Sequence, residues 1–225
     1  MKTLIELYFS PGAAGNFFSR CLNLLDNAYC YASGTTIPVT IEEKFKLLSY
    51  SLVKDRSFDS NNTLSNDPAN NWLIFESQLR HVESLKDYTE LPENATVVVW
   101  LSHSHKRSDK TSSHPNRIFF YIDPSDAFEW MLLNCLYKDS NLQIGFISSG
   151  NELKHNPVVH NISLAKIVQD RDSFIEEFSR ACAIFNRQLS ALEIKYIVAL
   201  YDEWITTTLS PDKFQEFKNQ IGWYL

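Results

Sequence analysis

The sequence lacks several features that would assign the protein to well-known classes. No apolar run reaches the roughly 18 residues of a membrane-spanning helix, so no membrane span is expected. The four cysteines are far apart, which argues against a disulfide framework and favours buried free thiols. A formal net charge of -6 argues against broad nucleic-acid binding. The sequence also contains no internal repeat.

The first residues lack the basic start, long apolar stretch and small-residue cleavage site of a secretory signal, so a cytoplasmic protein is expected. What the chain does have is the composition of an ordered globular protein, with 44% hydrophobic and 13% aromatic residues. A chain of 225 residues can bury one sizeable core. We therefore predict a single domain over residues 1–225.

Short β-branched and aromatic runs alternate with segments of helical spacing, which predicts an α/β fold. The predicted strands are 4–9, 95–101, 117–122 and 158–162. The predicted helical segments are 17–25, 40–54, 72–85, a run after 123–126, a short turn at 163–168, and two closing helices. The closing helices begin with capping-box pairs, Ser173 with Glu176 and Ser190 with Glu193. We expect a three-layer α/β/α arrangement with a mostly parallel central sheet, and a long loop at 55–71 that is either a lid or a surface excursion.

The first candidate site follows the first predicted strand, at Ser10-Pro11-Gly12-Ala13-Ala14-Gly15-Asn16. Glycines let the backbone approach a ligand, and the first N–H groups of a helix suit an anion such as phosphate or sulfate. The loop has no lysine and lacks the Gly-Lys-Ser/Thr ending of nucleotide triphosphatases. A turn that only packs the first strand against the first helix is the alternative.

Two more polar segments follow predicted strands. His103 and His105 come directly after the second strand, where an imidazole can act as a general base near neutral pH. Asp123-Pro124-Ser125-Asp126 follows the third. Because the carboxyl ends of parallel strands open on one edge of a sheet, we expect these segments and the first loop to form one cleft.

The residues around the histidines allow two further interpretations. The spacing His103-x-His105, with Asp109 or His114, permits a metal site, but nothing downstream completes a known pattern, so no metal is predicted. The segment 106–110 is the densest basic cluster of the chain. It is either a holder for a phosphate or sulfate group or a solvated charged loop.

Together these features resemble the P-loop sulfotransferase-like family over most of the chain. In that family a loop of the form Pro-Lys-Ser-Gly-Thr-Thr-Trp binds the 5′-phosphosulfate end of 3′-phosphoadenosine 5′-phosphosulfate, and Pro11 to Phe18 occupies its place. Ser102-His103 is similar to the family's Thr-His, which implies that His103 is the catalytic base. Asp123-Pro124-Ser125-Asp126 is similar to the turn that binds the 3′-phosphate. The cosubstrate contacts that the resemblance implies are Gly12, Ala13, Ala14, Gly15, Asn16, Phe17, Asp123 and Ser125.

The chain departs from the family where charge is needed. The loop lysine falls on Ala13, the 3′-phosphate arginine on Ile122, and the helix serine near Trp130. The residues that can compensate are Arg20, Lys106, Arg107 and Arg117, and the aromatic residues that either line an acceptor pocket or belong to the core are Trp72, Phe75 and Trp130.

Two functions are therefore expected. The resemblance implies a P-loop enzyme that transfers a sulfuryl group from 3′-phosphoadenosine 5′-phosphosulfate to a hydroxyl or amine of a sugar, lipid or small metabolite. Its partner is then a small-molecule or glycan acceptor. The alternative is a catalytically reduced P-loop fold that serves as an anion- or nucleotide-binding or interaction module.

Overall fold

The structure is a computed structural model that describes residues 3–10, 12–26, 28–29, 31–32, 35–36, 40–42, 44–45, 96–102, 116–128, 130–131 and 155–208. Several predicted features lie outside the described residues. They are the helix at 72–85, the loop at 55–71, most of the helix at 40–54, and the segment 103–115 with both histidines and the basic cluster.

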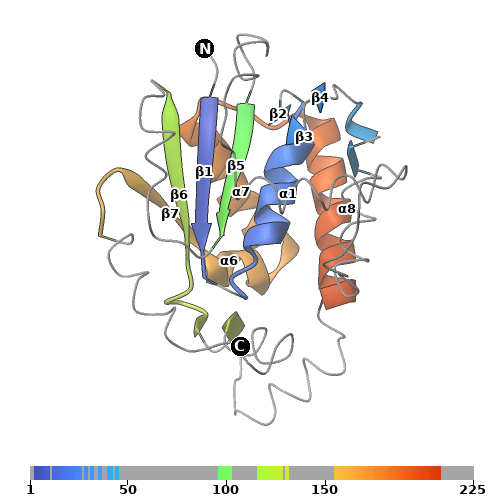
Figure 1. The fold of residues 1–225 in the computed structure, drawn as a ribbon. Helices are drawn as coiled ribbons and strands as arrows, with labels where there is room; N and C mark the ends of the chain where they lie inside the picture. The colour runs from blue at the N-terminus through green and yellow to red at the C-terminus, as the bar shows by residue number, and fades with distance from the viewer. Residues whose placement is uncertain are drawn as a thin grey trace, which may run out of the picture.

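A parallel sheet forms the centre of the described structure (Figure 1). Its strands are β1 (Thr3–Phe9), β2 (Ala28–Tyr29), β5 (Thr96–Ser102), β6 (Arg117–Asp123) and β7 (Val159–Ser163), in the order β2-β5-β1-β6-β7. Every neighbouring pair in this sheet is parallel. Two short strands, β3 (Tyr31–Ala32) and β4 (Thr35–Thr36), form a separate antiparallel pair. The α/β class is confirmed, and the four predicted strands are correct to within about one residue at each end.

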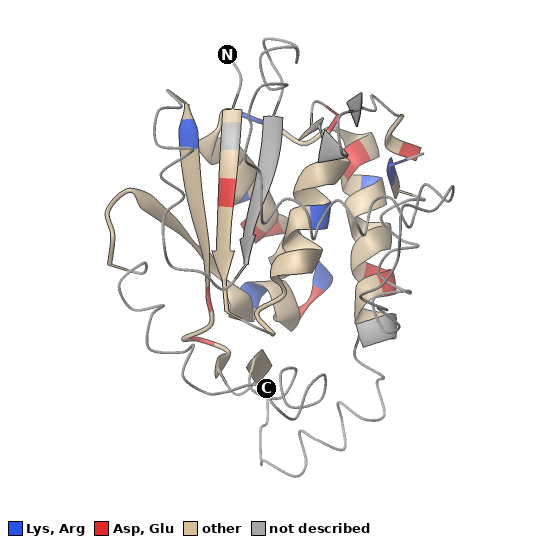
Figure 2. Cartoon of the chain, in the orientation of Figure 1, with Lys and Arg blue, Asp and Glu red and all other residues tan. Residues whose placement is uncertain are grey.

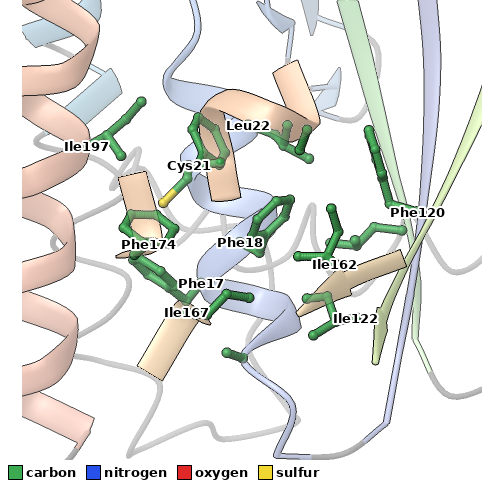
Figure 3. Packing of buried hydrophobic residues seen from close by; sticks show 14 of the residues in the cluster. Phe17, Phe18, Cys21, Leu22, Phe120, Ile122, Ile162, Ile167, Phe174 and Ile197 are labelled. Carbon is green, nitrogen blue, oxygen red and sulfur yellow. The ribbon is translucent and has the colours of Figure 1, made fainter. Parts of the chain in front are cut away.

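The four described helices are α1 (Gly15–Leu24), α6 (Leu164–Gln169), α7 (Arg171–Ile184) and α8 (Ala191–Thr208). Helix α1 packs against β1 and β5, and α7 packs against β7. Helix α8 packs against α1 and α7, and it lies on the far side of α1 from the sheet (Figures 1 and 3). All four helices bury side chains in the core on one face of the sheet. The expected helical layer on the other face has no counterpart within the described part of the chain.

Alternation along the strands separates the two faces of the sheet. Odd-numbered residues of β1 and even-numbered residues of β6 contribute to the main core, as Phe120, Ile122 and Ile162 do opposite Phe18 of α1 (Figure 3). The second face carries its own buried cluster of Tyr8, Phe119, Tyr121 and Val159.

The second face also buries a charge pair. Glu6, in the middle of β1, is fully buried. Its carboxylate accepts hydrogen bonds from Tyr8 Oη at 3.0 Å and from Arg117 Nε at 2.6 Å. The Arg117 guanidinium also lies 4.6 Å from the centre of the Phe119 ring. Arg117 is therefore part of the folded framework at the amino end of β6.

The two closing helices begin differently. For α8, the capping box is confirmed, since Ser190 N–H donates to Glu193 Oε2 at 2.7 Å and Glu193 N–H donates to Ser190 Oγ at 3.2 Å. For α7 the prediction is wrong, because the N-cap is Asp170, whose carboxylate accepts from Ser173 N–H at 2.8 Å. Glu176, the expected partner of Ser173, instead pairs with Lys166 at 3.0 Å.

Cys21 and Cys182 are buried free thiols, as expected. Burial raises the pKa of both thiols, that of Cys182 to about 12, so both are protonated and unreactive at neutral pH. In the described segments, no helix has the length and apolar character needed to span a membrane.

Candidate functional site

The strand order indicates which edge of the sheet is the candidate ligand site. From β1 the chain proceeds to β2 and β5 on one side, whereas from β6 it proceeds to β7 on the other side. Connections therefore diverge between β1 and β6, and ligands of parallel α/β sheets gather at the carboxyl ends of strands beside such a point. Residues 10–17 follow β1 here and residues 123–126 follow β6. We call these two segments the switch-point edge.

The loop after β1 has an unusual backbone. Gly12 has φ 80°, and Ala14, the N-cap of α1, is left-handed with φ 57° and ψ 17°. Ala13 N–H donates to Ser10 O at 3.0 Å, which closes the turn. A left-handed residue directly before a helix makes successive N–H groups converge into a concavity that favours anions.

The first turn of α1 has N–H groups without acceptors in the helix. The first helical bond runs from Phe18 N–H to Ala14 O at 2.9 Å, so Gly15, Asn16 and Phe17 precede it. Among the described residues, no side chain caps this helix. Three N–H donors and the positive end of the helix dipole are thus available at the switch-point edge.

The side chains of this turn serve packing. A Cβ at Gly15 would lie 2.0 Å from Cγ of Phe9, so the glycine is needed for the close approach of β1 and α1. The Phe17 ring is buried and stacks on Trp204 at 4.2 Å. Ala13, at the position of the family's lysine, is fully buried. The alternative interpretation of a packing turn therefore holds for Gly15, and these residues offer a ligand only their backbone.

Two buried polar side-chain atoms in this region have no hydrogen-bond partner among the residues that the structure describes. They are Asn16 Oδ1 and Trp130 Nε1. Trp130 is 1% exposed, and its ring lies 6.1 Å from that of Trp204, which stacks on Phe17. Trp130 thus belongs to the core, but its indole N–H remains an unused donor. A buried donor without an acceptor costs roughly 1–3 kcal/mol.

The turn after β6 contains two aspartates with different hydrogen-bond partners. Asp123 is half-buried and accepts a hydrogen bond from Ser125 N–H at 3.0 Å. Asp126 accepts from Ser163 Oγ at 2.6 Å and from Ala165 N–H at 3.1 Å. Asp126 therefore bonds to residues at the start of α6, whereas Asp123 bonds to Ser125 within the turn that follows β6.

Hydroxyl groups connect the two strands beside this turn. Tyr121 and Ser10 are nearly buried and share a side-chain hydrogen bond. Burial and the nearby charge of Asp123 raise the pKa of Tyr121 to about 12, so its hydroxyl is protonated at neutral pH. Ser10 is the first residue of the candidate loop proposed from the sequence, whereas Tyr121 was not predicted as a site residue. The alternation of side chains along a strand could have indicated Tyr121, because Tyr121 and Asp123 are two residues apart and therefore share one face of β6.

Cations are missing from the switch-point edge. Neither residues 10–17 nor residues 123–126 include Lys or Arg, and the loop after β6 is acidic (Figure 2). Arg117 is at the opposite end of β6, roughly 20 Å away at 3.3 Å per residue, and pairs with Glu6. Arg20 is 1% exposed and already has contacts within the protein. Ile122, at the place of the family's arginine, is fully buried.

The histidine predicted as the catalytic base lies just beyond the described chain. Ser102, the residue before His103, is in register with Phe9, so β5 ends beside the start of the loop after β1. His103, His105, Lys106 and Arg107 are outside the described residues. Within the part of the chain that the structure does describe, no group of three His, Cys, Asp or Glu side chains can hold a metal ion.

Comparisons with protein-family models, with curated proteins and with solved structures gave no match.

Proposed function

We propose that the switch-point edge binds the phosphate or sulfate group of a small ligand through the N–H groups of Gly15, Asn16 and Phe17. The observation that carries the proposal is the uncapped start of α1 behind the left-handed Ala14. In this proposal the chain is a single cytoplasmic three-layer domain of the P-loop type. Its ligand is a nucleotide such as 3′-phosphoadenosine 5′-phosphate.

The conformation of Ala14 supports a ligand role for the turn. A left-handed alanine costs roughly 1–2 kcal/mol relative to a right-handed one, and such strain clusters at binding sites. The turn also leaves three main-chain N–H groups without an acceptor from α1. An anion satisfies them all and is favoured by the helix dipole.

The lack of Lys and Arg in residues 10–17 and 123–126 lowers the affinity that we expect for the anion. A hydrogen bond to a charged group contributes about 1.5–3 kcal/mol, so replacing two cations by Ala13 and Ile122 lowers affinity by a hundredfold or more. Binding that relies on backbone donors is therefore weak, with dissociation constants above those of a loop that carries lysine.

Proline and alanine at position 16 test the proposal. Asn16→Pro removes one N–H that has no acceptor in α1, and proline is tolerated in the first turn of a helix. Asn16→Ala retains that N–H. We expect 3′-phosphoadenosine 5′-phosphate to raise the melting temperature of wild type and Asn16→Ala but not of Asn16→Pro, since ligand at a hundred times its Kd stabilises by about 2.7 kcal/mol. Circular dichroism checks that both variants are folded, and no shift in wild type at millimolar ligand refutes the proposal.

Sulfuryl transfer is a second candidate, favoured by the register of Ser102 with Phe9. In this reaction a hydroxyl or amine of the acceptor attacks the sulfur of 3′-phosphoadenosine 5′-phosphosulfate. The bond from sulfur to the phosphate oxygen breaks, 3′-phosphoadenosine 5′-phosphate leaves, and His103 takes the acceptor proton.

Two histidine variants test the transfer. His103→Ala is expected to abolish sulfuryl transfer and to retain binding of 3′-phosphoadenosine 5′-phosphate. His160→Ala, at an exposed position of β7, is the matched control and retains both. Retained turnover in His103→Ala excludes His103 as the base.

A further inference from the structure

Arg117 is the first residue of β6, on the second face of the sheet and at the end of the strand opposite the switch-point edge. Its side chain is 10% exposed, and its guanidinium group has two contacts. Nε donates to Glu6 Oε1 at 2.6 Å, and the central carbon lies 4.6 Å from the centre of the Phe119 ring. The carboxylate holds one edge of the guanidinium and the ring covers one of its faces, so the group is fixed in position.

The ion pair of Arg117 with Glu6 uses only one of the arginine nitrogens. For comparison, Arg171 donates from both Nε and Nη2 to the carboxylate of Asp202. In the buried pair, Glu6 Oε2 accepts from Tyr8 Oη at 3.0 Å. Arg117 Nη2 is buried and has no hydrogen-bond partner among the described residues. A buried donor without an acceptor costs free energy, and an acceptor supplied by a ligand removes that cost.

We propose that Arg117 Nη2 binds the carboxylate of a small ligand at the amino end of β6. A guanidinium is planar and carries N–H donors on more than one edge, so it can pair with Glu6 and with a second carboxylate at the same time. The charge of Glu6 favours a carboxylate over a phosphate, because it repels a group with two negative charges more strongly than a group with one. This site uses none of the residues of the anion site proposed above.

The first experiment compares two arginines within wild type. The Nε–H resonances of Arg117 and Arg171 are followed while sodium acetate is added at low ionic strength, and sodium chloride is the control for added salt. We expect a saturable shift of the Arg117 resonance with acetate and none with chloride. Arg171 is the internal control, because its Nε and Nη2 already bind Asp202, and we expect no saturable shift there. An Arg117 resonance that responds alike to acetate and chloride overturns the inference.

The second experiment replaces the guanidinium by an ammonium group. Arg117→Lys keeps the positive charge but has no second planar donor, so we expect acetate to bind roughly tenfold or more weakly, as measured on the backbone amide resonance of Phe119. Arg171→Lys is the matched control and leaves the affinity unchanged. Circular dichroism checks that both variants are folded. Unchanged acetate affinity in folded Arg117→Lys overturns the inference, and if this variant does not fold, the comparison within wild type still decides.

The third experiment uses inorganic phosphate in place of acetate. We expect the Arg117 resonance to respond at lower concentrations of acetate than of phosphate. Tighter binding of phosphate at Arg117 overturns the assignment of a carboxylate. Shifts of the Gly15 and Asn16 amide resonances with phosphate report on the anion site proposed above, so failure of that proposal and failure of this inference are seen separately.

Discussion

At the scale of single residues, the contact of Gly15 with Phe9 decides what the glycine does. A sequence with small residues after a strand suggests a ligand-binding loop, and it equally suits a tight strand–helix contact. The ring of Phe9 occupies the space of a Gly15 Cβ. The glycine is thus explained by packing, and the case for an anion depends on the backbone of Ala14 and the residues after it.

The contact predicts the effect of one methyl group. Gly15→Ala is expected to lower the free energy of unfolding by about 1–3 kcal/mol, because Phe9 is nearly buried and has little room to move. Urea denaturation measures this cost. In a Phe9→Ala background the same change is expected to cost much less, as contacting residues are not additive. Equal costs in both backgrounds would show that the contact does not limit position 15.

At the scale of elements, the two closing helices show what a capping pattern can predict. Ser190 and Glu193 satisfy the pattern and make both bonds. Ser173 and Glu176 satisfy it as well, but Asp170 stands three residues earlier and its carboxylate already accepts the Ser173 N–H. The pattern identifies a possible helix start, and competition between nearby caps decides which one forms.

The start of α7 can be tested by two matched substitutions. Asp170→Ala removes the acceptor of both the Ser173 N–H and the Ser173 hydroxyl and is expected to lower the melting temperature. Ser173→Ala keeps the N–H bond to Asp170 and is expected to have a smaller effect. A larger drop in melting temperature for Ser173→Ala than for Asp170→Ala would instead identify Ser173 as the N-cap of α7.

The edge strand β7 is protected by side chains of α7. Ser163 N–H donates to Glu177 Oε1 at 2.8 Å, and Asn161 O accepts from Arg180 Nη2. Glu177 and Arg180 also pair with each other at 2.6 Å. Side chains that bond to an edge strand stop another chain from pairing there.

Removal of this protection has two expected effects. Glu177→Ala leaves the Ser163 N–H without its acceptor, so we expect a loss of about 1–3 kcal/mol of unfolding free energy and increased light scattering on storage. Glu176→Ala is the control, because Glu176 is 73% exposed and bonds only to Lys166 among the described residues. A substitution at such an exposed position changes the free energy of unfolding by no more than about 0.5 kcal/mol. Similar scattering by both variants would show that the edge is not protected by Glu177.

At the scale of the whole molecule, the sequence predicted elements better than their arrangement. β-Branched runs locate the strands because burial on both faces selects those residues. The order β2-β5-β1-β6-β7, which creates the switch point, arises from contacts between residues far apart in the chain, such as Phe9 with Ile122. The hydrogen bond between Ser10 and Tyr121 has the same origin, which is why Tyr121 was not predicted as a site residue from the sequence.

The buried carboxylate of Glu193 ties three parts of the molecule together. It accepts hydrogen bonds from Asp26 N–H after α1, from Arg187 between α7 and α8, and from Ser190 at the start of α8. Burial alone raises the pKa of Glu193, but these hydrogen bonds outweigh burial and lower it below its usual value. A carboxyl with a lower pKa in the folded state stabilises the fold above the pKa of the unfolded chain. This stability is lost as the pH falls through the folded pKa.

Acid titration of stability therefore tests the role of Glu193. Wild type is expected to lose unfolding free energy as the pH falls below about 4.5, measured by urea denaturation at a series of pH values. Glu193→Gln is expected to be less stable at pH 7 and to show a shallower decline in acid, because it has no proton to take up. Glu176→Gln, at an exposed position, serves as the control and follows wild type. If Glu193→Gln declines in parallel with wild type, the acid sensitivity belongs to other carboxylates, of which Glu177, whose pKa is also lowered, is the next to examine.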